Sequence, residues 1–493
     1  MRFVNRNDEL AELDRLLALS REHRHLAYLT GRRRIGKTSL LREWARGKRA
    51  FYFFAPRETP AGFLSLLSLQ ASSAGLIPDG TRFGTLDDGL RFLCATLPDT
   101  MDAVIIDEFQ NLGDVSAGMF SRIQRLWDER SDSSRGLLLA CGSMHSMMYR
   151  IFQGRKEPLY KRATARLSVD ELSPPAVARL AGGGGSLSPG KLFDLYSLFG
   201  GVPFYYTLVH SYGLRHAALR DILLRLVLDP DAVLYDEGRE LTIEALGRGH
   251  ANHFSILSAV AAGNTRHSEI LNATGMSPGS LGKYLGQLVD DYRFLRRVTP
   301  VFSRDGGKTS RYELADNFLS FWFRFVHRYR SRLEVGAAPD VVETILRDMP
   351  LWQGRLWERC VRSMLVDLNR RRAFSFPFVE IGPYFHRSGR GEVDLVLVGA
   401  ERDRLALCEC KRNLNTVNIP AAVAAVRSAA PPEAGPRPPV FLFSLNDITA
   451  KTRAQTNRCE GVTALSFREL LGQSQIAQTT ESRPKTPAGG DAT

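Results

Sequence analysis

The sequence predicts a multidomain α/β protein, and three observations support this fold class. The chain has 493 residues, which is too long for a single hydrophobic core, so three or four domains are expected. Near the amino end, a short apolar strand runs directly into a glycine-containing turn and then a helix. Near the carboxyl end, two apolar strands carry acidic residues and a lysine at alternating positions. We therefore expect a parallel sheet in the first part of the chain and a second α/β domain in the last.

The composition is typical of a soluble globular protein with an excess of positive charge. Hydrophobic residues make up 44% and charged residues 24% of the chain. No apolar run approaches the roughly 18–20 residues that cross a bilayer, and residues 1–9 are too charged for a signal peptide. These features predict a cytoplasmic protein with no membrane partner. The six cysteines form no C-x-x-C pair, which favours reduced thiols that hold no metal.

The formal net charge of +13 and the isoelectric point near 9.6 favour a polyanionic partner. Charge alone decides little, because many basic proteins bind no nucleic acid.

The stretch after the strand at 25–30 fits the phosphate-binding pattern G-x-x-x-x-G-K-S/T without a mismatch. Two glycines allow the backbone to turn successive N–H groups toward one anion, and a helix from Thr38 to Trp44 would direct its positive end at the phosphates. Lys37 would reach the β- and γ-phosphates, and the Thr38 hydroxyl would ligate Mg²⁺. The alternative is a basic surface turn. The residues expected to contact ATP are Gly31, Arg32, Arg33, Arg34, Ile35, Gly36, Lys37, Thr38 and Ser39.

Acidic and polar residues end two further predicted strands. The apolar strand at 103–108 ends in Asp107, expected to hold Mg²⁺ through water, and Glu108, expected to polarise the attacking water. Ser143 follows the strand at 136–141 and could sense the γ-phosphate or simply cap the strand. Arg162 lies outside regular structure and could serve as an arginine finger or hold a loop.

These motifs resemble those of the archaeal-type P-loop ATPases of the STAND class. That family combines Gly-Arg-Arg-Arg-x-Gly-Lys-Thr, a strand-end Asp-Glu and a Gly-Gly-x-Pro lid motif, which corresponds here to residues 200–203 with Pro203 at its end. The resemblance extends from residue 3 to about 420. It implies a P-loop NTPase parallel sheet in residues 1–170 and a helical lid in 171–245, with the glycine run at 182–186 as a loop or linker.

The opening of the family, Phe-x-x-Arg-x-x-Glu-Leu, matches Phe3, Arg6, Glu9 and Leu10. The resemblance implies that Arg6 lies near the adenine. Asn7 is expected to cap the first helix. The family usually has glycine where Lys161 stands.

Residues 246–332 carry the element order of a winged-helix domain. Helices are expected at 253–262, 267–273 and from 277, where Ser277-Pro278 forms a cap, followed by a hairpin of 294–301 with 310–314. The third helix would enter the major groove of double-stranded DNA, although winged helices also bind proteins. Residues 318–329 are rich in aromatic side chains and are expected to form a core helix rather than a base-stacking platform. The expected DNA contacts are Ser280, Lys283, Tyr284 and Gln287 on the helix, and Arg304, Lys308 and Arg311 on the hairpin.

Residues 333–470 are expected to form a restriction-endonuclease-like α/β domain. The strands at 391–398 and 405–411 should pair antiparallel, so that Asp394 meets Glu409 and Lys411 on one face. This is the D…(D/E)-x-K arrangement, in which the carboxylates hold Mg²⁺ and the lysine positions water. Glu358, on a helix at 354–368, could be a further metal-facing acid or pair with Arg362 at i,i+4.

The resemblance supports this interpretation, because the STAND-class ATPases of this type are known to end in a domain similar to restriction-type nucleases. The Ser/Thr/Pro/Gly-rich residues 471–493 are expected to be disordered.

Two functions fit these observations. The first is an ATP-driven enzyme that binds DNA through the winged helix and cuts it with Mg²⁺. The second is a regulatory switch, in which the nucleotide state repositions the winged helix toward a DNA or protein partner without cleavage. A homo-oligomer is compatible with either.

Overall fold

The chain divides into two compact units, Met1–Glu171 with Val202–Phe204, and Leu172–Gly201 with Tyr205–Thr493. Residue positions are taken from a computed structural model, which describes residues 3–95, 101–129, 135–182, 187–247, 250–303, 309–385, 391–401 and 404–473. Within these ranges no helix is both long enough and apolar enough to cross a bilayer.

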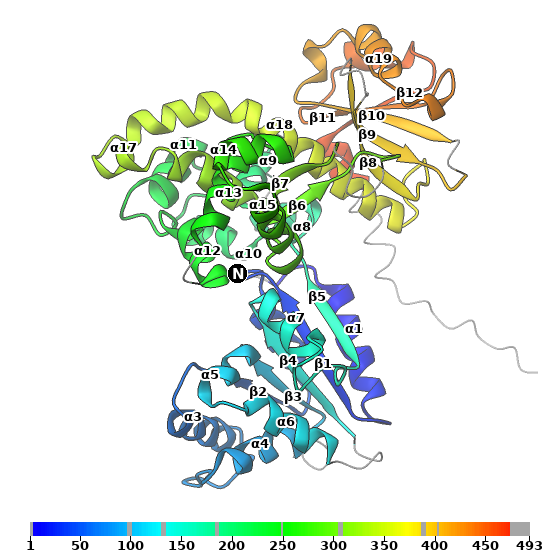
Figure 1. Ribbon diagram of the computed structural model, residues 1–493. Coiled ribbons are helices and arrows are strands. Elements are labelled where there is room, and N and C mark those ends of the chain that lie inside the picture. The colour runs from blue at the N-terminus through cyan, green and yellow to red at the C-terminus, as the bar shows by residue number, and fades with distance from the viewer. Residues whose placement is uncertain are drawn as a thin grey trace, which may run out of the picture. The chain divides into compact units, whose positions relative to one another are not determined.

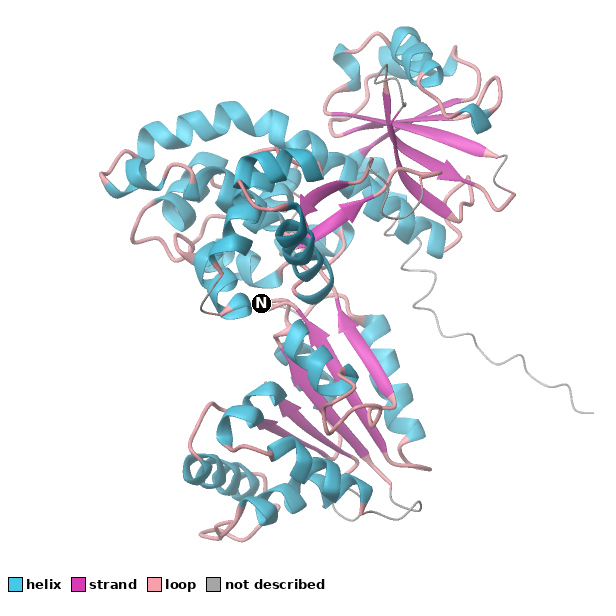
Figure 2. Ribbon diagram, in the orientation of Figure 1, coloured by secondary structure: helices cyan, strands magenta, loops and turns pink. Residues whose placement is uncertain are grey.

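The first unit is built on a five-stranded sheet in which every pairing is parallel (Figures 1 and 2). The strand order is β2-β3-β4-β1-β5, which confirms the predicted parallel sheet. Parallel strands bury both faces, and the apolar runs that predicted β1, β3 and β4 are buried along nearly their whole length. The strands are β1 (His25–Gly31), β2 (Ala50–Phe54), β3 (Ala103–Asp107), β4 (Leu137–Gly142) and β5 (Ala165–Val169).

Alternate residues of these strands form one core with the helices on one face of the sheet. Tyr28, Phe53 and Ile106 from neighbouring strands are each at most 1% exposed and pack with Phe63 and Phe152 from helices. The register of the sheet follows from this alternation. The helices of the unit are α1 (Asn7–Leu19), α2 (Lys37–Ala45), α3 (Pro60–Ser73), α4 (Leu86–Ala95), α5 (Leu112–Val115), α6 (Met119–Asp128) and α7 (His145–Gln153), with a 3₁₀ turn at Phe109–Asn111.

The predicted cap of the first helix is wrong. Asn7 is the first residue of α1, and the capping position belongs to Arg6, whose backbone is left-handed at φ 79°. No side chain accepts a hydrogen bond at this cap. The Arg6 side chain instead turns toward the phosphate loop, as described below.

The second unit begins with helices and contains a short hairpin. The sheet β6-β7 is antiparallel and follows three helices, in the order that the sequence predicts for residues 253–314. Part of the predicted glycine linker, residues 183–186, lies outside the described residues. The elements are α8 (Pro174–Gly182), α9 (Pro189–Phe199), α10 (Pro203–Ser211, which starts in the first unit), α11 (Leu219–Leu223), α12 (Glu237–Leu246), α13 (Ala251–Ala261), α14 (His267–Thr274), α15 (Pro278–Gly286), β6 (Leu295–Val298), β7 (Arg311–Leu314), α16 (Asn317–Phe321), α17 (Arg330–Glu334) and α18 (Ala338–Arg370).

Local chemistry explains the three helices and the aromatic segment after the hairpin. The Ser277 hydroxyl accepts the N–H of Ser280 with Pro278 in the first turn, which confirms the predicted cap of α15. Gly275 ends α14 with a left-handed φ of 65°. Phe318, Phe321 and Trp322 are fully buried, which confirms that this segment belongs to the core.

The chain ends in a mixed five-stranded sheet with the order β12-β11-β10-β9-β8. Strands β8, β9 and β10 pair antiparallel, whereas β10, β11 and β12 pair parallel. The helix predicted at 354–368 is the second half of the 33-residue α18, which contacts β9 and β10. The tail residues 474–493 lie outside the described part of the chain. The elements are β8 (Glu380–Phe385), β9 (Glu392–Val398), β10 (Leu405–Lys411), α19 (Ile419–Ser428), β11 (Val440–Ser444), α20 (Ala450–Asn457) and β12 (Val462–Ser466).

The second glycine of the Gly-Gly-x-Pro motif is required by a close backbone approach. A Cβ at Gly201 would lie 2.1 Å from the carbonyl oxygen of Leu172 and 2.5 Å from its nitrogen. The two residues are also joined by a hydrogen bond from the Leu172 N–H to the Gly201 carbonyl, 2.9 Å long. Any side chain at this position would force the two backbone segments apart.

We expect Gly201→Ala to lower the free energy of unfolding by about 1–3 kcal/mol, because the added methyl group overpacks a contact between backbones. Chemical denaturation followed by tryptophan fluorescence measures the effect. Gly190→Ala is the matched control, since a Cβ there meets no atom within 4 Å and lies in a helix. Equal stability of the two variants would contradict the steric explanation.

Candidate functional site

The predicted phosphate loop joins β1 to α2 at the carboxyl edge of the parallel sheet. Gly36 has a φ of +91°, a conformation that side chains rarely adopt, and this bend places α2 directly after the loop. The Lys37 ammonium is buried and donates to the carbonyl oxygens of Gly31 and Arg32, at 2.8 Å each. Burial lowers the pKa of Lys37. Thr38 and Ser39 are exposed at the start of the helix, whereas Ile35 is buried.

The carboxylate of Asp107 holds this edge of the sheet together. One carboxylate oxygen accepts hydrogen bonds from the Thr38 hydroxyl at 2.8 Å and the Tyr52 phenol at 2.5 Å. The other accepts the backbone N–H of Glu108 at 3.0 Å. Asp107 and Thr38 are therefore brought together as the sequence predicts. Tyr52 is not predicted by the motifs, because only the pairing of β2 with β3 brings it to Asp107.

Glu108 is directed by its backbone conformation and by two side chains. The strand ends at Asp107, and Glu108 follows in a left-handed conformation with φ 54°. One of its carboxylate oxygens accepts the Ser143 hydroxyl at 2.8 Å and also the side-chain amide of Gln110. Ser143 therefore lies at the predicted edge, in contact with Glu108. Gln110 is a further residue that strand patterns alone do not predict.

Residues from both ends of the first unit surround the loop. Arg6 pairs with Glu9 at 2.7 Å and donates to the Ile35 carbonyl at 3.2 Å, so the opening motif contacts the phosphate loop itself. A Cβ at Gly36 would lie 3.8 Å from the Pro203 ring, which places the lid-motif proline against the loop.

The arginines of the loop have protein partners. Arg32 pairs with Glu171 at 3.0 Å, and the Arg34 guanidinium lies 4.3 Å from the centre of the Phe204 ring. Neither Glu171 nor Phe204 is predicted from the sequence, because both come from segments far from the loop in the chain.

Arg162 lies where the parallel strands begin, whereas the phosphate loop lies where they end. It precedes β5, whose first residue Ala165 is level with Ala27 near the start of β1. Its guanidinium pairs with Asp128 at 3.0 Å and donates to the Tyr160 carbonyl at 3.1 Å. Of the two predicted roles, these contacts are those of a residue that holds a loop, and Arg162 is not part of the site within its own chain. Lys161 has a left-handed φ of 58°, a conformation that favours glycine.

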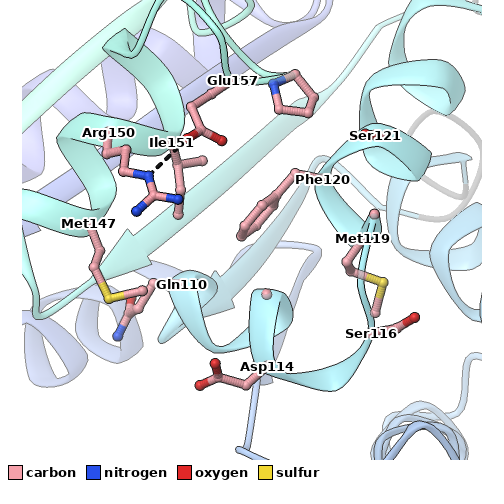
Figure 3. A pocket seen from close by; sticks show the side chains of 13 residues that line it. Gln110, Asp114, Ser116, Met119, Phe120, Ser121, Met147, Arg150, Ile151 and Glu157 are labelled. Carbon is pink, nitrogen blue, oxygen red and sulfur yellow. Dashed lines mark hydrogen bonds and ion pairs between the residues drawn. The ribbon is translucent and has the colours of Figure 1, made fainter.

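A pocket of about 370 Å³ lies beside Gln110 (Figure 3). Its wall includes the apolar side chains of Phe120, Met147 and Ile151, and the Arg150–Glu157 ion pair of 2.8 Å. The pocket is not predicted from the sequence, because its lining comes from helices that adjoin only in the folded chain. Since Gln110 also donates to Glu108, the pocket adjoins the hydrogen-bond partner of a candidate catalytic group.

Comparisons with known proteins agree with this fold and leave the activity open. A model of a family described as "Archaea bacterial proteins of unknown function" matches residues 322–419. An uncharacterised protein of Methanocaldococcus jannaschii is 28% identical over 417 residues, covering 82% of this chain and 86% of that protein. The Walker-type ATPase of Pyrococcus abyssi superposes with a TM-score of 0.52 at 18% identity, covering 65% of this chain and 96% of its own.

A weaker likeness is to the ORC2 protein of Aeropyrum pernix, with a TM-score of 0.45 at 15% identity, covering 69% of this chain and 95% of that one. At such identity, the likeness to the P. abyssi protein shows a shared fold.

The second predicted acidic site lies on β9, β10 and α18. The Asp394 carboxylate accepts the backbone N–H of Cys410 at 2.7 Å, so it lies beside β10 as the predicted hairpin requires. Lys411 forms an ion pair with Glu409. Glu358 lines the same pocket as Asp394. No Glu358–Arg362 ion pair forms, so between these two described residues the i,i+4 alternative is wrong.

The electrostatics of this second site are those of crowded carboxylates. Burial and then the neighbouring Glu409 charge raise the pKa of Asp394, while burial and then Asp394 raise the pKa of Glu358. Across the described residues, no three His, Cys, Asp or Glu side chains converge in a ready-made metal site. The acids therefore approach one another without forming a complete ligand set.

The expected DNA-contacting residues divide into two groups. Ser280 and Lys283 are exposed on α15. Tyr284 accepts a hydrogen bond from Asn252 at 2.8 Å, and Gln287 bonds to His253 at 2.9 Å, so both side chains contact α13. The helix-to-helix packing of α13 against α15 causes this.

On the hairpin, Arg311 stacks on Phe385 at 3.6 Å and faces Glu392 at 3.5 Å, rather than extending into solvent. Arg304 and Lys308 lie outside the described residues.

We expect Tyr52→Phe to lower the unfolding free energy of the first unit by about 1.5–3 kcal/mol, the range for a hydrogen bond to a charged group. The substitution removes one donor from the buried Asp107 and keeps the ring. Tyr149→Phe is the control, because Tyr149 is 50% exposed. Urea denaturation measures both, and an unchanged Tyr52→Phe variant would show that Asp107 does not depend on the phenol.

Proposed function

We propose that this protein binds ATP with Mg²⁺ at the loop Gly31–Thr38, hydrolyses it, and directs this activity to double-stranded DNA. The observation that carries the proposal is the 2.8 Å hydrogen bond between Thr38 and Asp107. A hydroxyl and a carboxylate meet at the sheet edge beside a buried lysine. These are the side chains expected to hold Mg²⁺ and the phosphates of a nucleoside triphosphate. The name of the P. abyssi structure, a Walker-type ATPase, supports the same interpretation.

The residues of the loop fit a magnesium ion bound with the nucleotide. Thr38 and Asp107 would hold Mg²⁺ through hard oxygen ligands, and when bound the ion offsets the negative charge of the phosphates. Lys37 would turn its ammonium from the carbonyl oxygens of Gly31 and Arg32 toward the β- and γ-phosphates. The backbone bend at Gly36 lets the N–H groups of the loop face the same anion.

Hydrolysis would depend on Glu108. Its carboxylate would accept a proton from the attacking water, and its hydrogen bonds to Ser143 and Gln110 hold that carboxylate in one orientation. Pro203 and Arg6 would complete the surroundings of the nucleotide, because both lie against the loop. Ser143 would then act through the position of Glu108.

We expect Lys37→Ala to abolish ATP binding in an equilibrium titration with a fluorescent ATP analogue. Glu108→Gln should bind ATP like the unmodified protein and lose hydrolysis by a factor on the order of 10²–10⁴, the usual contribution of a general base. Lys156→Ala is the control, since Lys156 is an exposed lysine of the same unit. ATP affinity unchanged in Lys37→Ala would remove the proposal.

DNA binding is proposed for α13 to α15 with the hairpin β6–β7, a helix-helix-helix-hairpin order that matches a winged helix. Ser280 and Lys283 are exposed on the third helix and would reach base edges and phosphates. The net charge of +13 supports a polyanionic partner.

A second candidate activity is Mg²⁺-dependent cleavage of that DNA. The observation in its favour is that Glu358 and Asp394 line one pocket, where burial and then the charge of Asp394 raise the pKa of Glu358. A divalent cation bound to Asp394 and Glu358 would relieve this repulsion, and other oxygen ligands would have to complete its shell, because no three acids converge there among the described residues. When bound, the ion would lower the pKa of a water molecule and stabilise charge on a phosphate. Lys411, paired with Glu409, would keep a positive charge beside that phosphate.

We expect the protein to nick supercoiled plasmid in Mg²⁺, and we expect nicking to disappear in Asp394→Asn and Lys411→Ala. Gel electrophoresis of the plasmid measures the reaction. Asp447→Asn is the control, because it is an exposed aspartate of the same unit whose partner is Arg468. Nicking that persists in both site variants rejects the cleavage site. If only ATP hydrolysis and DNA binding are found, the regulatory switch becomes the better description.

A further inference from the structure

We infer that the arginine-lined pocket between α18, the hairpin β6–β7 and strands β8 and β9 binds a backbone phosphate of DNA next to Asp394. We call it the arginine pocket. The inference rests on the proposed DNA-directed function and adds to it a binding site that no sequence motif predicted.

The pocket belongs entirely to the second unit and has a volume of about 100 Å³. Its charged lining consists of Arg296, Arg311, Arg355, Arg359 and Arg362, with Glu313, Glu358, Glu392 and Asp394.

Three of the five guanidinium groups are already used within the fold. Arg296 donates to Glu313, and Arg359 donates to the carbonyl oxygens of Leu314 and Ala315 at 2.9 and 2.8 Å. Arg311 stacks on Phe385 and faces Glu392. These contacts fix the wall of the pocket and hold the hairpin on the carboxyl-terminal sheet.

Arg355 and Arg362 are different. Among the described residues, neither guanidinium has a hydrogen bond or an ion pair, and both residues are exposed. They lie seven residues apart on α18, so they share the face of the helix that carries Glu358 between them. Two free guanidinium groups that flank a candidate catalytic acid form a fork for phosphate oxygens.

The alternative is that both arginines are ordinary solvated charges on a helix surface. Their position argues against this, because both arginines line the same pocket as Asp394 and Glu358. Carboxylates alone would repel a DNA strand. Arginines beside them offset this repulsion, so a negatively charged phosphate can approach Asp394.

The test is the salt dependence of DNA affinity, measured on the full chain by fluorescence anisotropy with a labelled duplex in EDTA, so that no strand is cut. We expect the double variant Arg355→Gln/Arg362→Gln to reduce the slope of log affinity against log salt by about 0.9, because the two arginines together neutralise one phosphate. Arg355→Lys/Arg362→Lys should keep the slope, because the charges remain.

The matched control is Arg347→Gln/Arg458→Gln. These exposed arginines belong to the same unit, have no hydrogen bond or ion pair among the described residues, and lie outside the pocket. The control removes the same total charge and should leave the slope nearly unchanged.

A slope in Arg355→Gln/Arg362→Gln that equals the control overturns the inference while leaving DNA binding through α15 in place. Absence of salt-dependent DNA binding by the unmodified protein overturns both the inference and the proposed DNA-directed function. An equal decrease of the slope in the control and pocket variants would show a general charge effect and would also reject the pocket.

Discussion

The carboxylate of Asp107 accepts three hydrogen bonds although only 1% of the residue is exposed. A buried carboxylate is costly unless it is fully hydrogen-bonded, and here its partners are Thr38 on α2, Tyr52 on β2 and the backbone of Glu108. This arrangement joins the phosphate loop to the middle of the sheet. The backbone N–H of Glu108 is one of the three donors, so the same carboxylate also holds the start of the turn that carries Glu108.

The same edge of the sheet gathers residues that are far apart in the chain because parallel strands end together. Strand β3 delivers Asp107 and Glu108, and β4, which lies beside β3 and β1, delivers Ser143. Residues that follow directly after parallel strands meet at this edge without further long-range contacts, because the strands end there together. The neighbouring Gln110 pocket shows that the edge continues into a hollow lined by helices.

The second unit uses charge differently. Burial and then the charge of Asp394 on β9 raise the pKa of Glu358 on α18, and arginines of α18 and of the hairpin line the same pocket as both acids. Removing one carboxylate or one guanidinium therefore changes the net charge of the pocket. Arg311 illustrates this: the residue expected to extend toward DNA instead stacks on Phe385, and so connects the hairpin to the carboxyl-terminal sheet.

The sequence by itself determined the helices and strands that depend on interactions between residues close together in the chain. The glycine pattern, the apolar strands ending in acids, the Ser277-Pro278 cap and the alternation around Asp394 all depend on neighbours within a few residues, and the corresponding strands and helices are present. Tertiary structure decided which side chains meet.

The partnership of Tyr52 with Asp107, the contact of Arg6 with Ile35 and the placing of Arg355 and Arg362 beside Asp394 arise between segments distant in the chain. Arg162 shows the same limit in reverse. The sequence around Arg162 does not indicate that β5, which follows it, begins at the edge of the sheet opposite the phosphate loop. Strand direction and order are properties of the assembled sheet.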